Sequence, residues 1–548
     1  MRNEATGSSE TADVIVVGAG VAGLCAAIAA HDAGARTLLL EASPLVGGTA
    51  SGSGGAAWIP LNRFLQQTGA DSRDAALQYM RHCADGHADE RVFEAYVDAA
   101  ADIASYLEQA TPLKLEMGTM PDYQGAAPGG FYAPNASRSV APEVFDLNRL
   151  GARGAQFRRS PYGTVPFSFS EFGKFDAAVH PERIDFVELN ERLKKGLVGW
   201  GEALTAALFA GVIDRGIEVR VDTRAVRLIF DDRTRGVVAV SGDRVLNLQA
   251  RRGVVLCAGG FEWDAGLMAA HFPGVDMVPS TVPTNRGDGW RMAEQAGAEM
   301  GNANSCWGWP SYLIPGEMQP EGVPLVRTSL VERGLPHLIM VNARGERFVD
   351  ESLPYHRIQK VMLERGADGT FQNLPAFHIF DQQFRDKYAF GPVMPGQPTP
   401  DWLRCFDTLG ALADAVGLPA AALYATVEKF NADVAQGVDA AFHRGTAPYA
   451  EFWGDRVNQP TPNLGNLVKA PFYVVEAIAS TLGTCSGPRT DANGRVMRVN
   501  GDPVPGLYAA GNVAAAFSGP SYFGPGGTIG PAMVFGVLGG RAAAAKST

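Results

Sequence analysis

Short apolar runs rich in β-branched residues alternate with helix-forming stretches at the start of the chain. Residues 13–17 (DVIVV) and 37–40 (TLLL) are typical of buried parallel strands. The stretch 24–30 between them favours a helix that ends near Gly34, because glycine often caps a helix C-terminus. Together these segments predict a β-α-β unit.

The pattern changes several times further along the chain. Residues 73–110 predict helix, whereas 118–180 are rich in Gly, Pro and aromatic residues and predict irregular structure. A helix is expected over 202–215 and another near Pro531. Short strands are expected at 217–221, 225–230, 236–240, 244–248, 253–256 and 506–510.

An apolar strand followed directly by glycines occurs in the N-terminal part of the chain and again near its C-terminus, but the composition of the middle part differs. Residues 313–480 contain more Pro, Tyr and Trp. This arrangement predicts a discontinuous first domain, formed by residues 1–312 and 484–548. A second domain, residues 313–483, would be inserted between the two segments.

Composition and charge exclude several classes of protein. Hydrophobic residues make up 46% of the 548 and charged residues 19%, which is enough apolar surface for large cores. The net charge of −11 argues against nucleic acid as the main partner. The six Cys and nine His show no metal-binding spacing, so no metal site is expected. Residues 1–11 lack an apolar signal core. The longest uncharged run, between Asp502 and Arg541, is broken by glycines and prolines and so does not fit a membrane span, which predicts a cytoplasmic protein.

A dinucleotide-binding motif follows the first expected strand. Gly18, Gly20 and Gly23 have the spacing G-x-G-x-x-G, which serves a tight turn, close approach of a pyrophosphate and close helix packing, respectively. The helix that begins here would direct its N–H groups at the phosphates. Glu41 ends the second strand, where its carboxylate would bind an adenosine ribose. These residues leave NAD and FAD both open.

Two further glycine-rich segments favour a flavin. Residues 47–55 (GGTASGSGG) follow Glu41 directly and could run along the rest of an extended FAD. Residues 507–512 (LYAAGN) resemble the flavoprotein segment that lies near the ribityl chain. Together with 254–260 they extend the flavoprotein pattern across the first domain.

The C-terminal segment 521–536 (SYFGPGGTIGPAMVFG) resembles the signature of the FAD-dependent 3-ketosteroid Δ1-dehydrogenases. They belong to the fumarate reductase/succinate dehydrogenase flavoprotein superfamily. Residues 53–60, 341–348, 351–355, 471–473 and 482–491 agree in order, and only 1–12 and parts of 130–200 fall outside the resemblance. It implies an α/β fold, with a discontinuous Rossmann-like FAD-binding domain of the GR2 type and an inserted α+β catalytic domain.

The resemblance also implies FAD contacts along the whole first domain. The residues expected to bind FAD are Gly18, Gly20, Val21, Ala22, Gly23, Glu41, Ala42, Gly48, Thr49, Ala50, Ser53, Gly54, Gly55, Ala225, Val226, Ala258, Gly259, Gly511, Asn512, Gly527, Thr528 and Ile529.

That family oxidises the A-ring of 3-ketosteroids between C1 and C2 during steroid degradation. The resemblance implies that Tyr355 removes the C2 proton with help from Tyr123, and that Tyr522 and the Gly526 N–H hold the C3 carbonyl oxygen. FAD N5 would take the C1 hydride and pass the electrons to an external acceptor such as a quinone. Because steroids partition into lipid, peripheral membrane contact is also expected. Phe523 replaces the family's more usual Pro after this tyrosine, which predicts a reshaped pocket mouth.

The chemistry explains why these residue types would serve. Loss of the α-proton forms an enolate, which two donors on the ketone oxygen stabilise. A tyrosine base has an ordinary pKa of about 10, so it needs a neighbouring hydroxyl or a positive field. The aromatic residues expected to line a flat apolar cleft are Trp307, Trp309, Tyr312, Phe472, Phe517 and Phe535.

Three other functions are consistent with parts of the pattern. A ketosteroid Δ4-dehydrogenase would share the cofactor and the pocket, although residues 528–531 (TIGP) favour Δ1. A fumarate- or urocanate-type ene-reductase would hold carboxylates with Arg and His, but the C-terminal glycine motif has no Arg before Arg541. A non-catalytic binding protein with a dinucleotide fold is the third.

Overall fold

The computed structural model describes residues 10–546 except 88 and 178. Its first elements are β1 (Glu10–Val17), α1 (Val21–Asp32) and β2 (Thr37–Leu40), which confirms the predicted β-α-β unit. Strand β1 pairs in parallel with β2 on one side and with β11 (Arg244–Leu256) on the other. The parallel strands are buried, as their apolar sequences predict.

These strands form the centre of an eight-stranded sheet with the order β21-β22-β11-β1-β2-β8. The outer strands are β8 (Glu218–Arg220), β21 (Arg495–Met497) and β22 (Pro503–Ala509). Strand β22 comes from the C-terminal part of the chain and pairs in parallel with β11. The two ends of the chain therefore build one sheet.

Strand β11 differs from the prediction, because the expected strands at 244–248 and 253–256 are one continuous strand. Its first half forms an antiparallel hairpin with β10 (Thr234–Ser241), which in turn pairs with β9 (Arg224–Phe230). Its second half joins the parallel sheet beside β1. One long strand thus belongs to two ladders, and short apolar runs do not reveal this.

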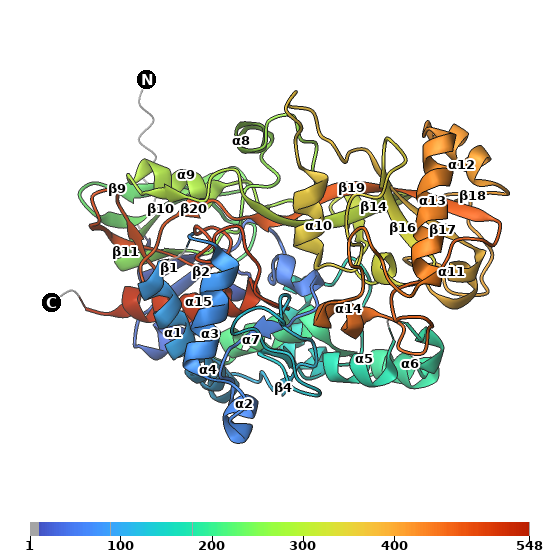
Figure 1. Cartoon of the computed structure of the whole chain (residues 1–548). Helices are drawn as coiled ribbons and strands as arrows, with labels where there is room; N and C mark the ends of the chain where they lie inside the picture. Colours follow the sequence, from blue (N-terminus) through green and yellow to red (C-terminus); the bar gives the residue numbers. More distant parts are fainter. Residues whose placement is uncertain (1–9, 88, 178, 547–548) are drawn as a thin grey trace.

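Helix α15 (Ile529–Ala544) packs closely against α1 and covers the sheet (Figure 1). Two glycines of α15 make this approach possible, because a Cβ on Gly536 would lie 2.6 Å from the Ala22 carbonyl oxygen and one on Gly540 would lie 2.3 Å from that of Ala26. The helix begins two residues before Pro531. Helices α3 (Arg73–Ala84), α4 (Glu90–Ala110) and α7 (Trp200–Asp214) complete this half of the molecule.

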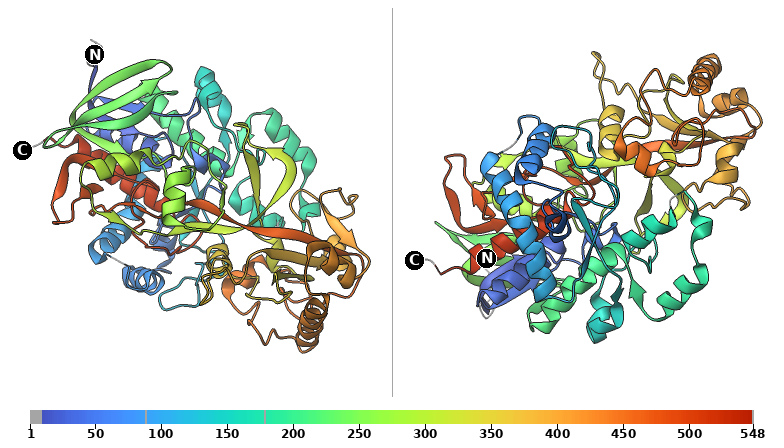
Figure 2. Two further views of the ribbon diagram at one scale, coloured as in Figure 1. Left: turned by 90° about the horizontal axis from the view of Figure 1, so that it is seen from above. Right: turned by 60° about the horizontal axis from the view of Figure 1, so that its bottom comes forward.

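A second, seven-stranded sheet has the order β15-β14-β19-β17-β16. Helices α12 (Leu409–Val416) and α13 (Ala420–Ala435) cover it at the end of the molecule opposite β1 and α15 (Figure 2). Five of its strands are β14 (Cys306–Met318), β15 (Pro324–Thr328), β16 (Leu338–Asn342), β17 (Ala376–Asp381) and β19 (Phe472–Thr484). The other two, β12 (Val278–Pro279) and β18 (Arg404–Phe406), both pair with β19. Strand β14 runs across residue 312, and the division into 1–312, 313–483 and 484–548 stays a prediction.

The elements between residues 118 and 180 are short, as the composition predicts. They include β5 (Ser139–Pro142) and α5 (Phe169–Phe175). In the part of the chain that the structure describes, no helix combines the length and apolarity needed to cross a bilayer, and no three His, Cys, Asp or Glu side chains gather as metal ligands. The six cysteines are free thiols.

Candidate active site

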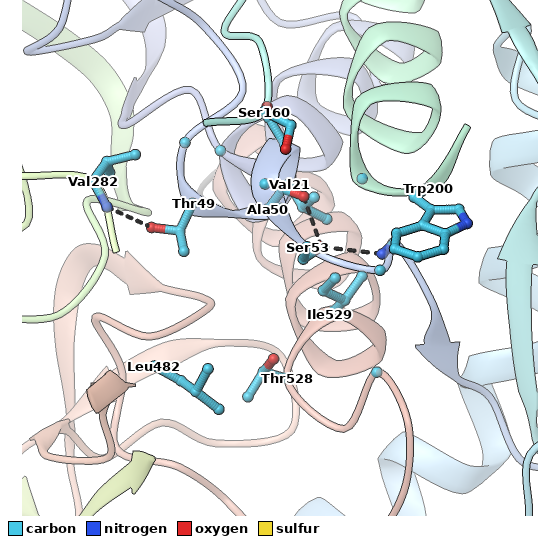
Figure 3. Close-up of a pocket in the computed structure, with 18 of the residues that line it drawn as sticks. Val21, Thr49, Ala50, Ser53, Ser160, Trp200, Val282, Leu482, Thr528 and Ile529 are labelled. Carbon is cyan, nitrogen blue, oxygen red and sulfur yellow. Dashed lines mark hydrogen bonds between the residues drawn. The ribbon is translucent and has the colours of Figure 1, made fainter. Parts of the chain in front are cut away.

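A cavity of about 740 Å³ lies between the two sheets, and residues from both line it. The wall nearest the first sheet contains the turn after β1, residues 48–56 and the start of α15. Figure 3 shows this wall, to which the loop with Thr49, Ala50 and Ser53 and the start of α15 with Thr528 and Ile529 both contribute. The cavity also reaches α10 (Tyr355–Met362) and α14 (Pro448–Trp453) in the other half.

The turn after β1 has the geometry that the glycine motif predicts. Gly18 has φ of 103°, and a Cβ there would lie 2.3 Å from the Cys257 carbonyl oxygen. Gly20 caps α1 and has open space around its Cα on the cavity side. A Cβ on Gly23 would lie 1.7 Å from the Gly18 carbonyl oxygen. Gly18 therefore permits the tight turn, Gly20 leaves room for a ligand to approach, and Gly23 allows close packing, as the motif predicts.

Glu41 lies in the cavity wall at the end of β2. Its carboxylate accepts hydrogen bonds from the Ala19 N–H at 2.8 Å and the Ser43 N–H at 2.9 Å. Burial raises the pKa of Glu41, and these backbone hydrogen bonds oppose the effect. The carboxylate is thus fixed beside the glycine turn, where it fits a ribose.

Residues 49–55 form a loop that is held by its own hydrogen bonds. The Ser53 hydroxyl donates to the Ala50 carbonyl at 2.7 Å and accepts from the Gly55 N–H at 3.1 Å (Figure 3). The Thr49 hydroxyl accepts from the Val282 N–H at 3.4 Å. These bonds fix the loop along the cavity, as an extended dinucleotide requires.

All but three of the predicted cofactor residues line this cavity. They are Gly18, Gly20, Val21, Ala22, Glu41, Ala42, Gly48, Thr49, Ala50, Ser53, Gly54, Gly55, Ala225, Ala258, Gly259, Gly511, Asn512, Thr528 and Ile529.

The structure places the other three, Gly23, Val226 and Gly527, away from the cavity wall. Gly23 packs α1 against the turn. Val226 is 41% exposed whereas its neighbour Ala225 is 3% exposed, because successive strand residues face opposite sides. Gly527 lies under the Tyr522 ring, where a Cβ would come within 2.9 Å. The side chain of Val226 therefore faces away from the cavity, and the two glycines act there through packing. Cofactor contact by these three residues stays a prediction.

Three of the predicted catalytic residues are tyrosines that come together from distant parts of the chain. Tyr355 is the first residue of α10, Tyr123 lies in the loop after β4 (Leu115–Met117), and Tyr522 precedes α15. The Tyr123 hydroxyl donates a hydrogen bond to the Tyr355 oxygen at 2.8 Å. The rings of Tyr355 and Tyr522 are 5.8 Å apart between centroids. All three are buried and line the cavity.

Gly526, the fourth predicted catalytic residue, offers a fixed N–H beside Tyr522. It has φ of 79°, and a Cβ would lie 2.2 Å from the Ala56 carbonyl oxygen, so only glycine fits. Its carbonyl accepts hydrogen bonds from the Trp58 and Gly530 N–H groups, but among residues 10–546 without 88 and 178 no acceptor meets its own N–H. The Tyr522 hydroxyl lies 3.2 Å from that of Thr528. Two neutral donors are therefore available at one end of the cavity.

Burial dominates the titration of this cluster. It raises the pKa of Tyr355 and of Tyr123 well above the ordinary value of a phenol. Burial also lowers the pKa of the adjacent His356 to about 3, so this imidazole is neutral near pH 7.

Sequence reasoning finds only part of the apolar wall. Trp309 and Tyr312 line the cavity as predicted. Trp307, Phe517 and Phe535 line a separate small pocket, and Phe472 packs beneath α12 and α13. The wall residues that no motif indicates are Met120, Phe169, Phe172, Leu330, Val331, Glu332, Tyr449 and Trp453. They come from separate segments, and only the tertiary fold brings them together.

The dinucleotide cradle and the adjoining cluster of phenols define the class of protein as an FAD-dependent oxidoreductase. The chain belongs to the FAD binding domain family, whose model matches residues 13–529. When bound, FAD supplies a two-electron acceptor.

Individual relatives are similar over almost the full length. The chain is 37% identical to 4-oxocyclohexanecarboxylate 2-dehydrogenase of Sinomonas cyclohexanicum, over 98% of this chain and 93% of that protein. It is 36% identical to 3-oxosteroid 1-dehydrogenase of Mycolicibacterium smegmatis, over 96% of each. The structure resembles the crystal structure of 3-ketosteroid Δ1-dehydrogenase from Sterolibacterium denitrificans in complex with 1,4-androstadiene-3,17-dione. The TM-score is 0.90 at 33% identity, over 98% of this chain and all of the other.

Proposed function

We propose that the protein desaturates neutral 3-ketosteroids between C1 and C2. The observation that carries this proposal is that the Tyr123–Tyr355 hydrogen bond lies next to the Tyr522 and Gly526 donors in one cavity. A ketone held by the two donors would present its neighbouring C–H to a phenol oxygen.

In this proposal Tyr355 acts as the general base and removes the C2 proton. Tyr123 donates a hydrogen bond to the Tyr355 oxygen and so stabilises the phenolate before the transfer. Tyr522 and the Gly526 N–H stabilise the negative charge that develops on the C3 oxygen. Loss of hydride from C1 would complete the new double bond, and a bound FAD would supply the acceptor for that hydride.

The charges around the cavity favour a neutral substrate over a carboxylate. The names of both relatives describe oxidation at the position β to a ring ketone, but one of those ketones carries a carboxylate. Arg327 lines the cavity and is engaged by Glu317 through contacts of 2.6 and 3.0 Å. Glu332 adds a buried carboxyl group to the wall; burial raises its pKa, and neither form of a carboxyl group offers a positive charge to a substrate carboxylate. The Arg327–Glu317 ion pair also argues against an ene-reductase, because an arginine that is paired with a glutamate is not free to bind a dicarboxylate substrate.

The remaining parts of the proposal concern partners and location. An external acceptor, such as a quinone, would reoxidise the flavin. We place the protein in the cytoplasm, with peripheral membrane contact as a source of steroid. A Δ4-dehydrogenase remains the alternative in which the same ketone is held and C4–C5 is oxidised.

The test is turnover of androst-4-ene-3,17-dione by the purified yellow protein with an indophenol dye, followed by identification of the product. We expect steroid-dependent dye bleaching and a C1–C2 double bond. Using 5α-androstane-3,17-dione as a second substrate separates the regiochemistries, because a Δ4-dehydrogenase would give the 4-ene. Faster turnover of 4-oxocyclohexanecarboxylate than of either steroid would contradict the substrate class. A colourless protein without turnover would favour a non-catalytic binding protein.

A further inference from the structure

Residues 156–163 form a strap that lies along one edge of the cavity. Ser160 and Tyr162 of this strap line the cavity, and Figure 3 shows Ser160 in its wall. The strap is bound on one side to the loop after β2, because the Arg158 N–H donates to the Val46 carbonyl at 2.9 Å. The strap and the cofactor cradle are therefore neighbours along the backbone.

On its other side the strap contacts the hairpin of β14 and β15, which belongs to the second sheet. The Tyr162 hydroxyl donates to the Val326 carbonyl at 2.9 Å. Glu321, in the turn of the hairpin, accepts a hydrogen bond from Arg158 Nη1 at 2.5 Å. Thr328 at the end of β15 lines the same cavity. The strap thus joins the two halves of the molecule at the cavity edge.

Arg158 connects the hairpin to the ribose-binding end of the cradle. While its Nη1 donates to Glu321, its Nη2 donates to the Ser43 hydroxyl at 3.0 Å. The Ser43 N–H in turn donates to the Glu41 carboxylate at 2.9 Å. A continuous series of contacts therefore runs from the hairpin turn, through one guanidinium, to the carboxylate that fits the cofactor ribose.

This series depends on a buried charge. Arg158 is 5% exposed, and within the described residues Glu321 is its one salt-bridge partner. The adjacent Arg159 pairs instead with Glu202. Separating a buried cation from its carboxylate leaves an uncompensated charge, which is strongly unfavourable. The ion pair therefore opposes movement of the hairpin away from the strap.

Three segments that line the cavity meet at Arg158, although the guanidinium itself lies behind the wall. They are the loop after β2 with Ala42, the strap with Ser160, and the hairpin with Thr328. Separating these segments opens this edge of the cavity beside Glu41. The contacts of Arg158 oppose that separation from both sides.

We propose that Arg158 is a positioning residue for FAD, which joins these three segments around the adenosine end of the cofactor and so slows FAD release. It acts through Ser43 and Glu321. This inference depends on the binding of FAD and not on the identity of the substrate, so a failure of steroid turnover leaves it standing.

Glu321→Gln is the most direct test, because the residue lies in the turn of the hairpin and its loss leaves both strands intact. The variant holoprotein should release FAD about tenfold faster than the parent at 25 °C, since truncating one partner of an ion pair acts mainly on the dissociation rate. Release is measured as the rise in flavin fluorescence after dilution into an excess of a competing flavin-binding apoprotein. Circular dichroism establishes that the variant is folded. Release at the parent rate from a folded variant would mean that the contact only stabilises the fold, and would overturn the proposal.

A double-mutant cycle tests whether the two residues act through one contact. Arg158→Met should release FAD at least as fast as Glu321→Gln, because it also loses the hydrogen bond to Ser43. Combining the two changes should release FAD no faster than Arg158→Met alone. Arg158→Lys, which retains the charge, should release FAD more slowly than Arg158→Met. Additive effects of the two single changes would contradict the proposed contact.

Glu346→Gln provides the control. Glu346 accepts from Arg344 at 2.7 Å in the same half of the molecule, and neither residue lines the cavity. This variant should release FAD at the rate of the parent. An equal acceleration would mean that the loss of any ion pair in this half has the effect, and would overturn the proposal.

Discussion

The cofactor cradle and the tyrosine cluster share one cavity but are built differently. The cradle consists mainly of backbone, with glycines such as Gly18 and Gly23 where a Cβ would strike a carbonyl oxygen. The cluster consists of side chains on separate elements, joined by hydrogen bonds such as that between Tyr123 and Tyr355. A backbone site fails when the chain cannot adopt its path, whereas a side-chain site can lose one group and keep its shape.

This difference predicts two kinds of damage. Substitutions in the cradle should reduce folding and FAD content together. Substitutions in the cluster should reduce turnover and leave the protein yellow. The following variants test that division, beginning with the largest expected effect.

Gly18→Ala should prevent accumulation of the yellow protein. The new Cβ would lie 2.3 Å from the Cys257 carbonyl oxygen, at φ of 103°. We expect a loss of at least about 3 kcal/mol in unfolding free energy, measured by thermal or urea unfolding. Gly34→Ala is the control, because Gly34 also has positive φ but no atom within 4 Å of a Cβ, and it should cost about 1 kcal/mol with FAD retained. Equal effects of the two variants would contradict the steric account.

Tyr522→Phe should keep FAD and lose turnover. Removing one donor from a site of this kind costs about 2.7–4 kcal/mol, or 10²–10³ in kcat. Steady-state dye reduction with androst-4-ene-3,17-dione measures the loss. Tyr312→Phe, which removes a phenol hydroxyl elsewhere in the same cavity, should stay close to the parent. If Tyr522→Phe were equally active, the ketone would be held by other groups.

Tyr123→Phe should have a smaller effect that depends on pH. A hydrogen bond to a charged group contributes about 1.5–3 kcal/mol, so kcat should fall about 10- to 100-fold at neutral pH. Without the donor the pKa of Tyr355 rises, and the rising limb of the kcat profile moves to higher pH. A limb that moves to lower pH would show that Tyr123 opposes ionisation of Tyr355.

Val226→Ala should have the smallest effect. Its side chain lies on the exposed face of β9, opposite to Ala225 on the cavity. The change in unfolding free energy should stay within about 0.5 kcal/mol, and the FAD absorbance per protein should be unchanged. Loss of flavin from this variant would mean that Val226 contacts the cofactor after all.

The sequence could predict the cradle because its requirements are local. Glycines at fixed spacing, an apolar strand and an acid at the next strand end specify one turn, and the structure builds it with Gly18, Gly20 and Glu41 in the wall. The outward direction of the Val226 side chain was not predictable, because successive strand residues face opposite sides and sequence alone left the register open. The sequence also did not predict that residues 244–256 form one strand, because the pairing of its two halves with β10 and β1 depends on the tertiary fold.

The active cavity was predictable only where a family motif marks it. Tyr355, Tyr522 and Gly526 lie in such motifs, and the structure brings them to one cavity. Tyr449 and Trp453 are in a segment without a recognisable pattern. Their place in the cavity wall depends on how α14 packs beside Tyr123, which is a tertiary effect.

The central claim, that Tyr355 is the base for oxidation of a 3-ketosteroid, is tested most directly by anaerobic single-turnover mixing of the parent and Tyr355→Phe with androst-4-ene-3,17-dione. The account predicts that the flavin absorbance of the parent bleaches as the 1,4-diene forms, whereas the variant stays yellow, with the bleaching rate reduced at least about 10²-fold. Bleaching of Tyr355→Phe at the rate of the parent would contradict the account.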